Sequence, residues 1–293
     1  MYLKLLFVFF ITLTTLQLHA RAQVMGYLKK DLDYFKYKDT RLAFGLWIDQ
    51  LAQEKDVQLI IKYYNDPKVA LQEYKEHKID SYSLNVVYYL KNMKEYDALS
   101  QQYWGMLNKN NVPEDLIILV SANSNIKTIK DLKNKIIARK SDDLLAQLFL
   151  DKELLSSVHH ISRGYINHYY LLEKDSTAIL KTFFHKADAC IVPSAALNMA
   201  AELNPIIKKR LRILKTSPNI YFPGLMIIHS NTPKYLIQKF RRSIANLDKT
   251  VKGRNIKALF KITNFAPVSP ANMDVLRNFY LNYLQLKAKY KNE

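Results

Sequence analysis

Residues 114–137 read EDLIILVSANSNIKTIKDLKNKII, and this stretch decides the fold class. The apolar run at 116–120 has the length of a buried strand, and a polar turn around Ser124 follows it. Residues 129–132 can form one helical turn, and a second apolar run begins at 135–138. The pattern therefore predicts a strand, a turn, a short helix and another strand in close succession, as in a layered α/β protein.

The same alternation continues along the chain and predicts α/β layers around largely parallel sheets. Pro67 opens one of the helices, because proline is favoured in a first helical turn. No repeat and no Gly- or Pro-rich linker divides the chain, so we expect two lobes of interwoven segments rather than consecutive domains. We expect helices at 40–55, 67–77, 85–90, 141–155, 176–184, 195–203, 233–247 and 272–289, and further strands at 57–63, 79–82, 187–192, 211–214 and 225–229.

The N-terminus has the layout of a secretory signal peptide. Lys4 supplies the positive charge, residues 5–16 are apolar, and small residues recur at Ala20 and Ala22. The apolar stretch is shorter than the roughly 20 residues that cross a bilayer. We expect residues 1–22 to be removed, after Ala20 or Ala22, on export to the periplasm. An uncleaved N-terminal anchor is the alternative.

The chain has 293 residues, 49% of them hydrophobic, and a formal charge of +18. This composition supports a packed core and argues against global disorder. Much of the positive charge lies between 208 and 261, where Asp248 is the only acid. We interpret this segment as a solvated Lys-rich surface and expect no nucleic-acid partner, because no nucleic-acid-binding module is visible. Binding to an anionic surface is the alternative.

The sequence offers little enzyme chemistry. Cys190 cannot form an internal disulfide because it is the only cysteine, and its apolar neighbours favour a small core residue over a nucleophile. The histidines at 159, 160, 168 and 185 follow no standard metal-ligand spacing. Phosphate-loop, G-x-S-x-G and H-E-x-x-H motifs are missing. We therefore expect a protein that is not an enzyme and has no metal site and no cofactor.

Several segments, in this order and spacing, resemble the substrate-binding proteins of phosphate, phosphite and phosphonate ABC importers. The likeness runs from about residue 42 to residue 289. The segments are the helix after Thr40, then Lys78-Ile79-Asp80, Lys130-Asp131-Leu132-Lys133-Asn134-Lys135, the run from His185 to Val192, Glu202-Leu203-Asn204-Pro205 and Leu214-Lys215-Thr216-Ser217-Pro218.

The resemblance implies a type 2 periplasmic-binding-protein fold, in which two α/β lobes, each a mixed, mostly parallel sheet flanked by helices, close over a ligand. Lobe one would comprise residues 23–117 and 225–293, and lobe two residues 118–224. The chain would cross between the lobes near 116–120 and 225–228.

The resemblance also implies where the ligand contacts lie. In phosphonate-binding members, a Ser-Thr-Ser-like cluster heads a helix of lobe two, and here that position reads Ser141-Asp142-Asp143. Ser141 fits the pattern, but the two acids depart from it. They would repel a dianion in the cleft, or else would cap the helix and point away from the ligand.

The remaining implied contacts come from other loops. Asp188 matches an acidic position of the family, and it either contacts the ligand or ties down a loop through hydrogen bonds. The family has a ligand-binding tyrosine at the position that Leu84 occupies here. We therefore take the nearby Tyr82 as its substitute. The ligand-binding residues expected from the resemblance are Tyr34, Thr40, Tyr82, Asn85, Ser141 and Asp188.

These expectations together describe an exported, monomeric solute-binding protein. It would capture a small anionic or phosphonate-like ligand between two lobes and deliver it to the permease of an ABC importer. The alternative keeps the fold and makes the protein a periplasmic ligand sensor, with a membrane signalling partner and a different ligand.

Overall fold

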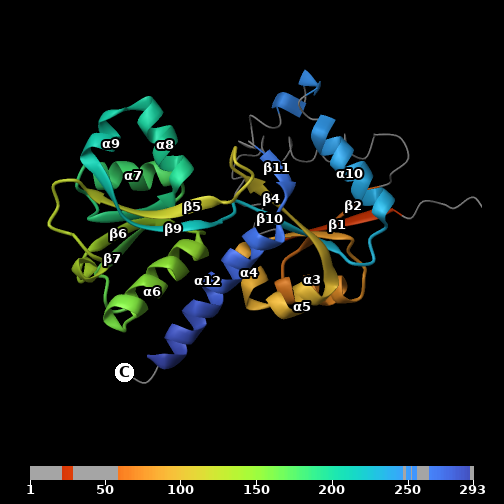
Figure 1. Ribbon diagram of the computed structural model, residues 1–293, viewed down its shortest axis with the longest axis horizontal. Coiled ribbons are helices and arrows are strands. Elements are labelled where there is room, and N and C mark those ends of the chain that lie inside the picture. The colour runs from red at the N-terminus through yellow and green to blue at the C-terminus, as the bar shows by residue number, and fades with distance from the viewer. Residues whose placement is uncertain (1–21, 29–58, 247–248, 252, 256–263, 291–293) are drawn as a thin grey trace, which may run out of the picture.

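The computed structural model describes residues 22–28, 59–246, 249–251, 253–255 and 264–290 of the chain. Two α/β bodies lie side by side along the long axis of the molecule, each built around its own β-sheet (Figure 1). We call these sheets A and B. The predicted α/β class with two mixed sheets flanked by helices is therefore confirmed. The expected helix at 40–55, with Tyr34 and Thr40 beside it, lies outside the described residues.

Sheet A has six strands in the order β11-β4-β10-β3-β1-β2. Strand β1 runs parallel to its two neighbours, β2 and β3, and β10 is antiparallel to both β3 and β4. The strands are β1 Gln23–Leu28, β2 Leu59–Tyr64, β3 Ser81–Leu84, β4 Ser100–Leu107, β10 Leu225–His229 and β11 Asn264–Pro267.

Sheet B has five strands in the order β7-β6-β8-β5-β9. Here β6 runs parallel to β7 and β8, and β5 is antiparallel to β8 and β9. Both sheets thus place a parallel trio of strands next to one antiparallel strand. The strands are β5 Glu114–Ser121, β6 Ile136–Lys140, β7 His168–Leu172, β8 Ala189–Pro193 and β9 Leu211–Tyr221.

Helices cover both faces of each sheet, as expected for strands that are buried on both sides. The sheet A helices are α3 Pro67–Lys75, α4 Val86–Lys91, α5 Met93–Leu99 and α10 Lys234–Asn246. The sheet B helices are α6 Leu144–Val158, α7 Asp175–Phe183, α8 Ser194–Leu203 and α9 Ile206–Arg210. None of the helices in the described part of the chain is long and apolar enough to cross a membrane.

The stretch at 114–137 folds as its sequence predicts. It forms β5, the single helical turn η1 (Ile129–Leu132) and the start of β6. Asp131 fixes this turn, because its Oδ2 accepts the backbone N–H of Thr128 at 2.8 Å while the hydroxyl of Thr128 also reaches it. β5 is almost completely buried and pairs on both sides, which explains its unbroken apolar run.

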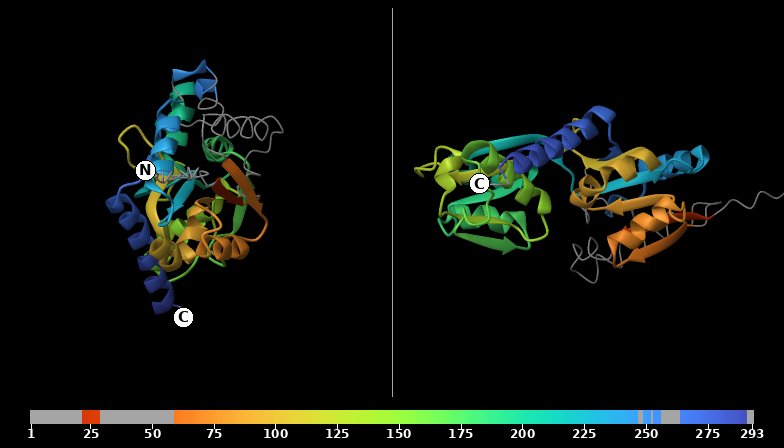
Figure 2. Two further views of the ribbon diagram at one scale, coloured as in Figure 1. Left: turned by 90° about the vertical axis from the view of Figure 1, so that its right-hand side faces the viewer. Right: turned by 90° about the horizontal axis from the view of Figure 1, so that it is seen from below.

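The chain passes from sheet A to sheet B between β4 and β5 and returns between β9 and β10. The last helix, α12 (Pro270–Lys289), then follows β11 of sheet A but packs against α6 and β9 of sheet B. Figure 1 and the right-hand view of Figure 2 show it running from one body towards the other. Its buried face belongs to the same core cluster as α6, formed on α12 by Met273, Leu276, Phe279, Tyr280 and Tyr283.

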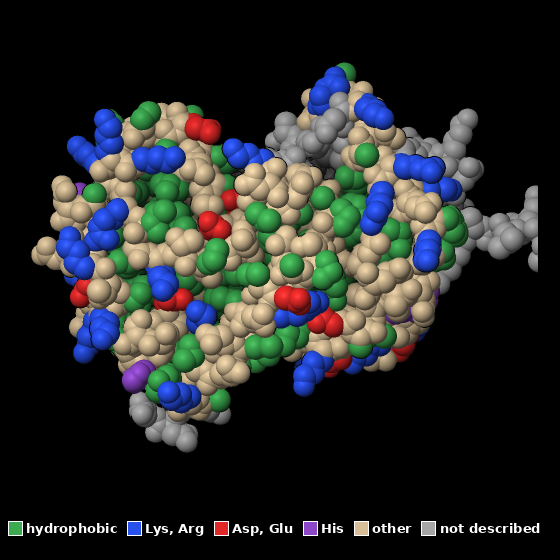
Figure 3. All heavy atoms as spheres, viewed as in Figure 1, with side chains coloured by type: hydrophobic (Ala, Val, Ile, Leu, Met, Phe, Trp, Pro, Cys, Tyr) green, Lys and Arg blue, Asp and Glu red, His purple; other side chains and the backbone are tan. Residues whose placement is uncertain are grey.

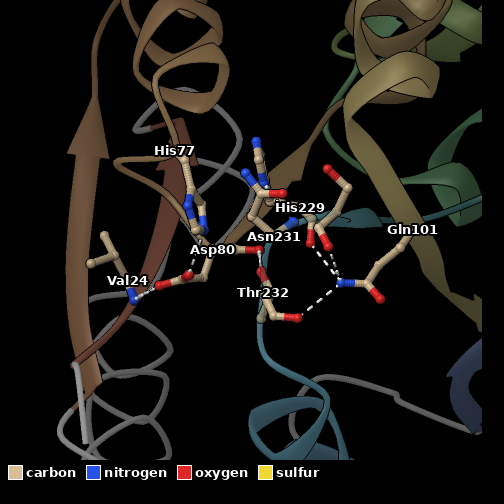
Figure 4. A network of polar contacts seen from close by, with 8 residues as sticks. Val24, His77, Asp80, Gln101, His229, Asn231 and Thr232 are labelled. Atoms are coloured by element: carbon tan, nitrogen blue, oxygen red, sulfur yellow. Dashed lines mark hydrogen bonds and ion pairs between the residues drawn. The ribbon is translucent and has the colours of Figure 1, made fainter. Parts of the chain in front are cut away.

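A polar network closes the end of sheet A at which β3 begins (Figure 4). Asp80 is buried there, and its carboxylate accepts the backbone N–H of Val24 at 2.8 Å. The ring of His77 contacts the same carboxylate at 3.2 Å and stacks on His229. The amide nitrogen of Gln101 reaches the backbone oxygens of His229 and Thr232 at 2.9 and 3.0 Å. These bonds join β1, β3, β4 and β10 across the sheet.

Candidate ligand-binding site

A small pocket lies where the two bodies meet, and segments of both sheets line it. Its volume is about 70 Å³, which is room for a few water molecules or one small polar group. Three segments surround it: the start of α4, the loop between β6 and α6, and the return crossing between β9 and β10. The lining residues are Asn85, Val86, Lys140, Asp142, Asp143, Leu145, Tyr221, Phe222, Pro223 and Gly224.

Sheet A contributes Asn85, the residue that joins β3 to α4. Its side-chain Oδ1 accepts the backbone N–H of Val87 at 2.8 Å and so caps α4. This cap holds the Asn85 side chain at the mouth of the helix, on the wall of the pocket. Asn85 is thus the one sequence-predicted ligand residue, among those described, that lines the pocket.

Sheet B contributes the loop after β6, which contains three charged residues. Lys140 ends β6, and its ammonium lies 3.3 Å from a carboxylate oxygen of Asp142. Asp143 caps α6, because its Oδ1 accepts the backbone N–H of Ala146 at 2.9 Å. Both acids line the pocket, which favours the alternative in which they lie close to a ligand. Asp143 also caps α6, as the other alternative expects.

The carboxyl group of Asp143 is buried, and only one of its oxygens has a hydrogen-bond partner among the described residues. Oδ1 is taken by Ala146, whereas Oδ2 receives no donor. Burial raises the pKa of Asp143 to about 6, against the opposing effects of the Ala146 N–H, Lys140 and Arg139. The carboxyl group therefore holds a buried acceptor oxygen that the described part of the chain does not satisfy.

Arg139 supports this loop from behind. Its Nη1 donates to the backbone oxygens of Lys140 and Asp143, at 2.9 and 3.1 Å. Its guanidinium is buried and lies 5.6 Å from the ring centre of Tyr169, and burial lowers its pKa. Arg139 fixes the course of the main chain between β6 and α6, and with it the direction of both acids.

The return crossing closes the third side of the pocket. Phe222 is buried and packs against Gly105 of β4, where a β-carbon would come within 2.8 Å of its ring. Gly105 is therefore required for the close approach of this crossing to sheet A. Gly224 also lines the pocket, and a β-carbon added there would meet no atom within 4 Å.

Two of the predicted ligand residues lie away from this pocket. Tyr82 is fully buried in the core of sheet A, where its ring contacts those of Tyr64, Tyr74 and Tyr96. Ser141 is exposed, and its backbone N–H donates to the carbonyl of Leu172 in β7. The neighbours of Ser141, rather than Ser141 itself, line the pocket.

Asp188 lies at the end of sheet B opposite to the pocket. Its Oδ2 accepts the backbone N–H of Ile136 at 2.8 Å, and Ile136 is the first residue of β6. Lys140, at the pocket, is the last residue of the same strand, about 13 Å further along at 3.3 Å per residue. This position favours the alternative that Asp188 ties down a loop.

The residues considered for enzyme or metal chemistry are separate from the pocket. Cys190 is buried in β8, and burial raises its thiol pKa to about 12, which keeps it protonated and unreactive. Within the described residues, no three His, Cys, Asp or Glu side chains gather to hold a metal ion.

The basic segment from 208 to 261 is divided between the two bodies. Lys208, Lys209 and Arg210 belong to α9 at sheet B, whereas Arg241 and Arg242 belong to α10 at sheet A. Figure 3 shows Lys and Arg side chains spread over both halves of the visible face. The positive charge of this segment is therefore distributed rather than concentrated on one element.

Comparisons with known proteins agree with this architecture. Residues 34–273 match the family model described as ABC transporter, phosphonate, periplasmic substrate-binding protein. We found no match among curated protein sequences.

Solved structures with the same fold cover nearly the whole chain. A Xanthomonas citri protein bound to chloride ion has a TM-score of 0.59 at 12% identity, and the alignment covers 92% of this chain and 99% of that one. A binding protein component of an ABC phosphonate transporter from Pseudomonas aeruginosa has a TM-score of 0.58 at 11% identity, with 92% and 89% covered. A Prochlorococcus marinus protein in complex with methylphosphonate has a TM-score of 0.55 at 13% identity, with 93% and 99% covered.

Proposed function

The chain belongs to the family of periplasmic substrate-binding proteins of phosphonate ABC transporters, and on this premise we propose that it captures a small phosphonate-like ligand in the pocket between sheets A and B. One observation supports this location above all. The pocket is lined at once by Asn85 from sheet A, by Lys140 and Asp143 from sheet B, and by the crossing that joins them. A ligand bound there would touch both bodies.

The proposed mechanism is closure of two lobes over the ligand. A ligand favours the closed form only through contacts that the open form lacks. The ligand would bind to one body first. Closure would then bring the other body against the ligand and add those contacts. The crossings between β4 and β5 and between β9 and β10 would be the hinge. The closed form would then be recognised by the permease of an importer.

We propose lobe one as residues 23–117 and 225–293 and lobe two as residues 118–224. The strand order supports this division apart from residues 114–117, which belong to β5 of sheet B. Residues 23–107 and 225–267 supply sheet A, and residues 114–221 supply sheet B. The packing of α12 on α6 and β9 adds a third connection between the lobes. Closure would therefore have to accommodate α12 as well as the two crossings.

Lys140 is the proposed cation for an oxyanion of the ligand. Its side chain is largely buried and lies at the pocket beside Asp142. An ammonium group can donate to a phosphonate oxygen while it keeps one carboxylate partner. The side-chain amide of Asn85 can donate from the opposite wall. Of the residues expected from the sequence, Tyr34, Thr40, Tyr82 and Ser141 stay predictions. For Asp188 we propose a structural role, which its hydrogen bond from the Ile136 N–H supports.

A thermal-shift screen of the mature protein tests this function. Phosphate, phosphite, sulfate and a series of alkylphosphonates would be added in large excess over the protein. A ligand that binds only the folded state raises the melting temperature by mass action. Phosphonates are expected to raise it and Lys140→Met is expected to weaken the effect. The proposal fails if no anion of the series raises the melting temperature of the unmodified protein.

The proposed cellular location follows from the family and from the N-terminus. We propose that residues 1–22 are a signal peptide and that the mature protein begins near Gln23 in the periplasm. N-terminal sequencing of the protein released from the periplasm tests this. A first residue near 23 supports the proposal, and retention of Met1 in the membrane fraction contradicts it.

A further inference from the structure

Sheet B has one end at the pocket and one end far from it. At the pocket, Lys140 ends β6 and Tyr221 ends β9. At the other end these two strands begin, at Ile136 and Leu211. We call this second end the distal end of sheet B. The connections that meet there are 122–135, 159–167, 184–188 and 204–210.

The distal end is strongly basic. All four of its connections contain Lys or Arg side chains that are exposed and that form no ion pair with another residue described by the structure. These residues are Lys127, Lys130, Lys133, Arg163, Lys186, Lys208, Lys209 and Arg210. The surface therefore carries positive charge that the described part of the chain does not neutralise.

The few acids at the distal end do not cancel this charge. Oδ2 of Asp131 accepts the backbone N–H groups of Lys127 and Thr128. Asp188 accepts the N–H of Ile136 and lies 3.9 Å from the half-buried Lys135. Glu202, near the end of α8, is a third acid at this end.

The pocket end of the same sheet has the opposite sign. The acids at or next to the element ends there outnumber Lys109, Lys140 and Lys174; they are Glu114, Asp115, Asp142, Asp143, Glu173 and Asp175. The two ends are about 13 Å apart along β6. This separation exceeds the screening length of about 8 Å at physiological ionic strength. The body around sheet B is therefore an electric dipole with its positive pole away from the pocket.

Exposed apolar side chains lie among the cations of the distal end. Phe184, two residues before Lys186, is 62% exposed. Leu203 ends α8 and is 90% exposed, and Ile206, at the start of α9, is half exposed. Surfaces that combine basic and apolar side chains are typical of proteins that lie on membranes. The cations meet anionic head groups, and the apolar groups enter the interface.

We propose that the distal end of sheet B docks on a bilayer that contains anionic phospholipid. Charge complementarity supports this partner, and the exposed apolar side chains favour a bilayer over a dissolved polyanion. Figure 3 shows Lys and Arg side chains along the edge of the molecule that lies farthest from sheet A. The pocket lies at the opposite end of sheet B, so docking does not cover it.

This inference goes beyond ligand capture and does not depend on which ligand the pocket holds. A binding protein serves a permease that lies in a membrane. Docking through the distal end keeps the protein at that membrane without a lipid anchor. The positive pole faces the lipid, and the acidic pocket end faces away from it, so the field of an anionic surface also orients the body.

Sedimentation with lipid vesicles tests the proposal on the mature protein. One set of vesicles contains phosphatidylglycerol and phosphatidylcholine, and the other contains phosphatidylcholine alone. At physiological ionic strength the protein is expected to bind the first set and not the second, and added salt should weaken the binding. If the protein does not bind the vesicles that contain phosphatidylglycerol, the proposal is overturned.

A triple variant locates the contact. Lys130→Gln, Lys186→Gln and Lys209→Gln together remove one cation from each of three distal connections. One cation near an anionic surface contributes about fivefold to binding, so the triple variant should bind about 100-fold more weakly. All three side chains are exposed, so the fold should be retained, as a thermal melt of the variant would verify.

The matched control removes the same charge from the other body. Its changes are Lys68→Gln, Lys91→Gln and Lys94→Gln, at exposed lysines of α3, α4 and α5. This control should keep its vesicle affinity within a factor of about three, because its charges lie beyond the screening length from the docked surface. Equal losses in the two triple variants would mean that the attraction depends on net charge alone, and would overturn the proposal.

Phe184→Ala distinguishes a bilayer from a dissolved polyanion. Loss of the ring from the interface should weaken vesicle binding by about tenfold and leave binding to heparin unchanged. Leu144→Ala is the control, because it removes an exposed apolar side chain at the pocket end. It should bind vesicles like the unmodified protein. If Phe184→Ala binds vesicles as tightly as the unmodified protein does, the distal end is a general polyanion site and the membrane proposal is overturned.

Discussion

Asp80 and Asp188 hold equivalent positions in the two sheets. Asp80 precedes β3 and accepts the backbone N–H of Val24 in β1, and Asp188 precedes β8 and accepts that of Ile136 in β6, each at 2.8 Å. Each Asp also donates its own N–H to the carbonyl of the same partner residue. The Lys-x-Asp pattern at 78–80 and 186–188 is thus the signature of one structural device used twice, at the end of a parallel trio of strands.

The first prediction concerns these two acids. Asp188→Ala should lower the free energy of unfolding by about 1 to 3 kcal/mol, because the N–H of Ile136 loses its acceptor. Asp80→Ala should cost more, since Asp80 is almost fully buried and also holds His77. Urea denaturation measures both values. Ligand affinity of the Asp188 variant, measured by calorimetry, should equal that of the unmodified protein; a tenfold loss would return Asp188 to the binding site.

The second prediction is that Asp143→Asn stabilises the ligand-free protein at neutral pH. The folded carboxyl has a pKa of about 6, whereas an aspartate in an unfolded chain titrates near ~3.9. Since the folded state holds the proton more tightly, the carboxyl weakens the fold as the pH rises from about 4 to about 6. Above about pH 6, the ionised carboxylate of Asp143 lowers the free energy of unfolding by about 3 kcal/mol.

Denaturation at pH 4 and pH 7.5 tests this sign. The stabilising effect of Asp143→Asn should be large at pH 7.5 and small at pH 4. Three charged neighbours influence the carboxyl group of Asp143. Arg139 and Lys140 favour its charged form, and Asp175 opposes it. All three are present in both proteins, so they do not account for the difference between the two. Equal effects at the two pH values, or a less stable variant at pH 7.5, would contradict the burial of this carboxyl group.

The third prediction concerns the return crossing. Gly105→Ala places a methyl group 2.8 Å from the ring of Phe222 and 3.1 Å from Val268, so either the crossing or β4 must shift. Overpacking of this kind costs about 1 to 3 kcal/mol. Because Phe222 lines the pocket, ligand affinity should fall as well. Gly224→Ala is the matched control for stability alone, because Gly224 also lines the pocket. Its added methyl meets no atom within 4 Å and should change the free energy of unfolding by less than about 0.5 kcal/mol.

The fourth prediction is that Cys190 takes no part in function. Its thiol is buried and its pKa is raised to about 12 by burial, so an aromatic disulfide reagent should not react with the native protein. Reaction of one thiol per chain is expected after unfolding in urea. Cys190→Ala should leave ligand affinity unchanged. Rapid labelling of the native protein, or loss of binding in the variant, would contradict the assignment.

The fold could be predicted largely because its buried strands are short, unbroken apolar runs. β5 and β8 are covered on both faces, and their sequences show it directly. The apolar pattern predicts a strand that ends at residue 214, whereas β9 extends to Tyr221, through Pro218. It lies at the end of the sheet B order, where a strand can contain proline without breaking a ladder on its open side.

Other elements gave no clear pattern. The segment that forms β4 contains Gln101, Gln102 and Gly105. These residues act through tertiary contacts, with segments that are distant in the sequence. Gln101 donates to the backbone oxygens of His229, the last residue of β10, and of Thr232 beyond it, and Gly105 makes room for Phe222. Such requirements depend on segments more than a hundred residues away, and local sequence does not contain them.

The site was only partly predictable for the same reason. The sequence pointed to the loop at 141–143, but the direction of each side chain there depends on its neighbours. The backbone N–H of Ser141 donates to a carbonyl of β7, and Ser141 is exposed. Arg139 donates to the main chain of the same loop, in which Asp142 and Asp143 line the pocket. Residues Tyr221–Gly224 match no binding motif and became part of the site only through the crossing. Tyr34 and Thr40 lie outside the described residues.

A crystal structure of the mature protein with a bound alkylphosphonate would show where the ligand lies. We expect one ligand between sheets A and B, within hydrogen-bond distance of Asn85 on one side and of Lys140 on the other. A ligand that binds elsewhere, or that contacts only one of the two bodies, would contradict it.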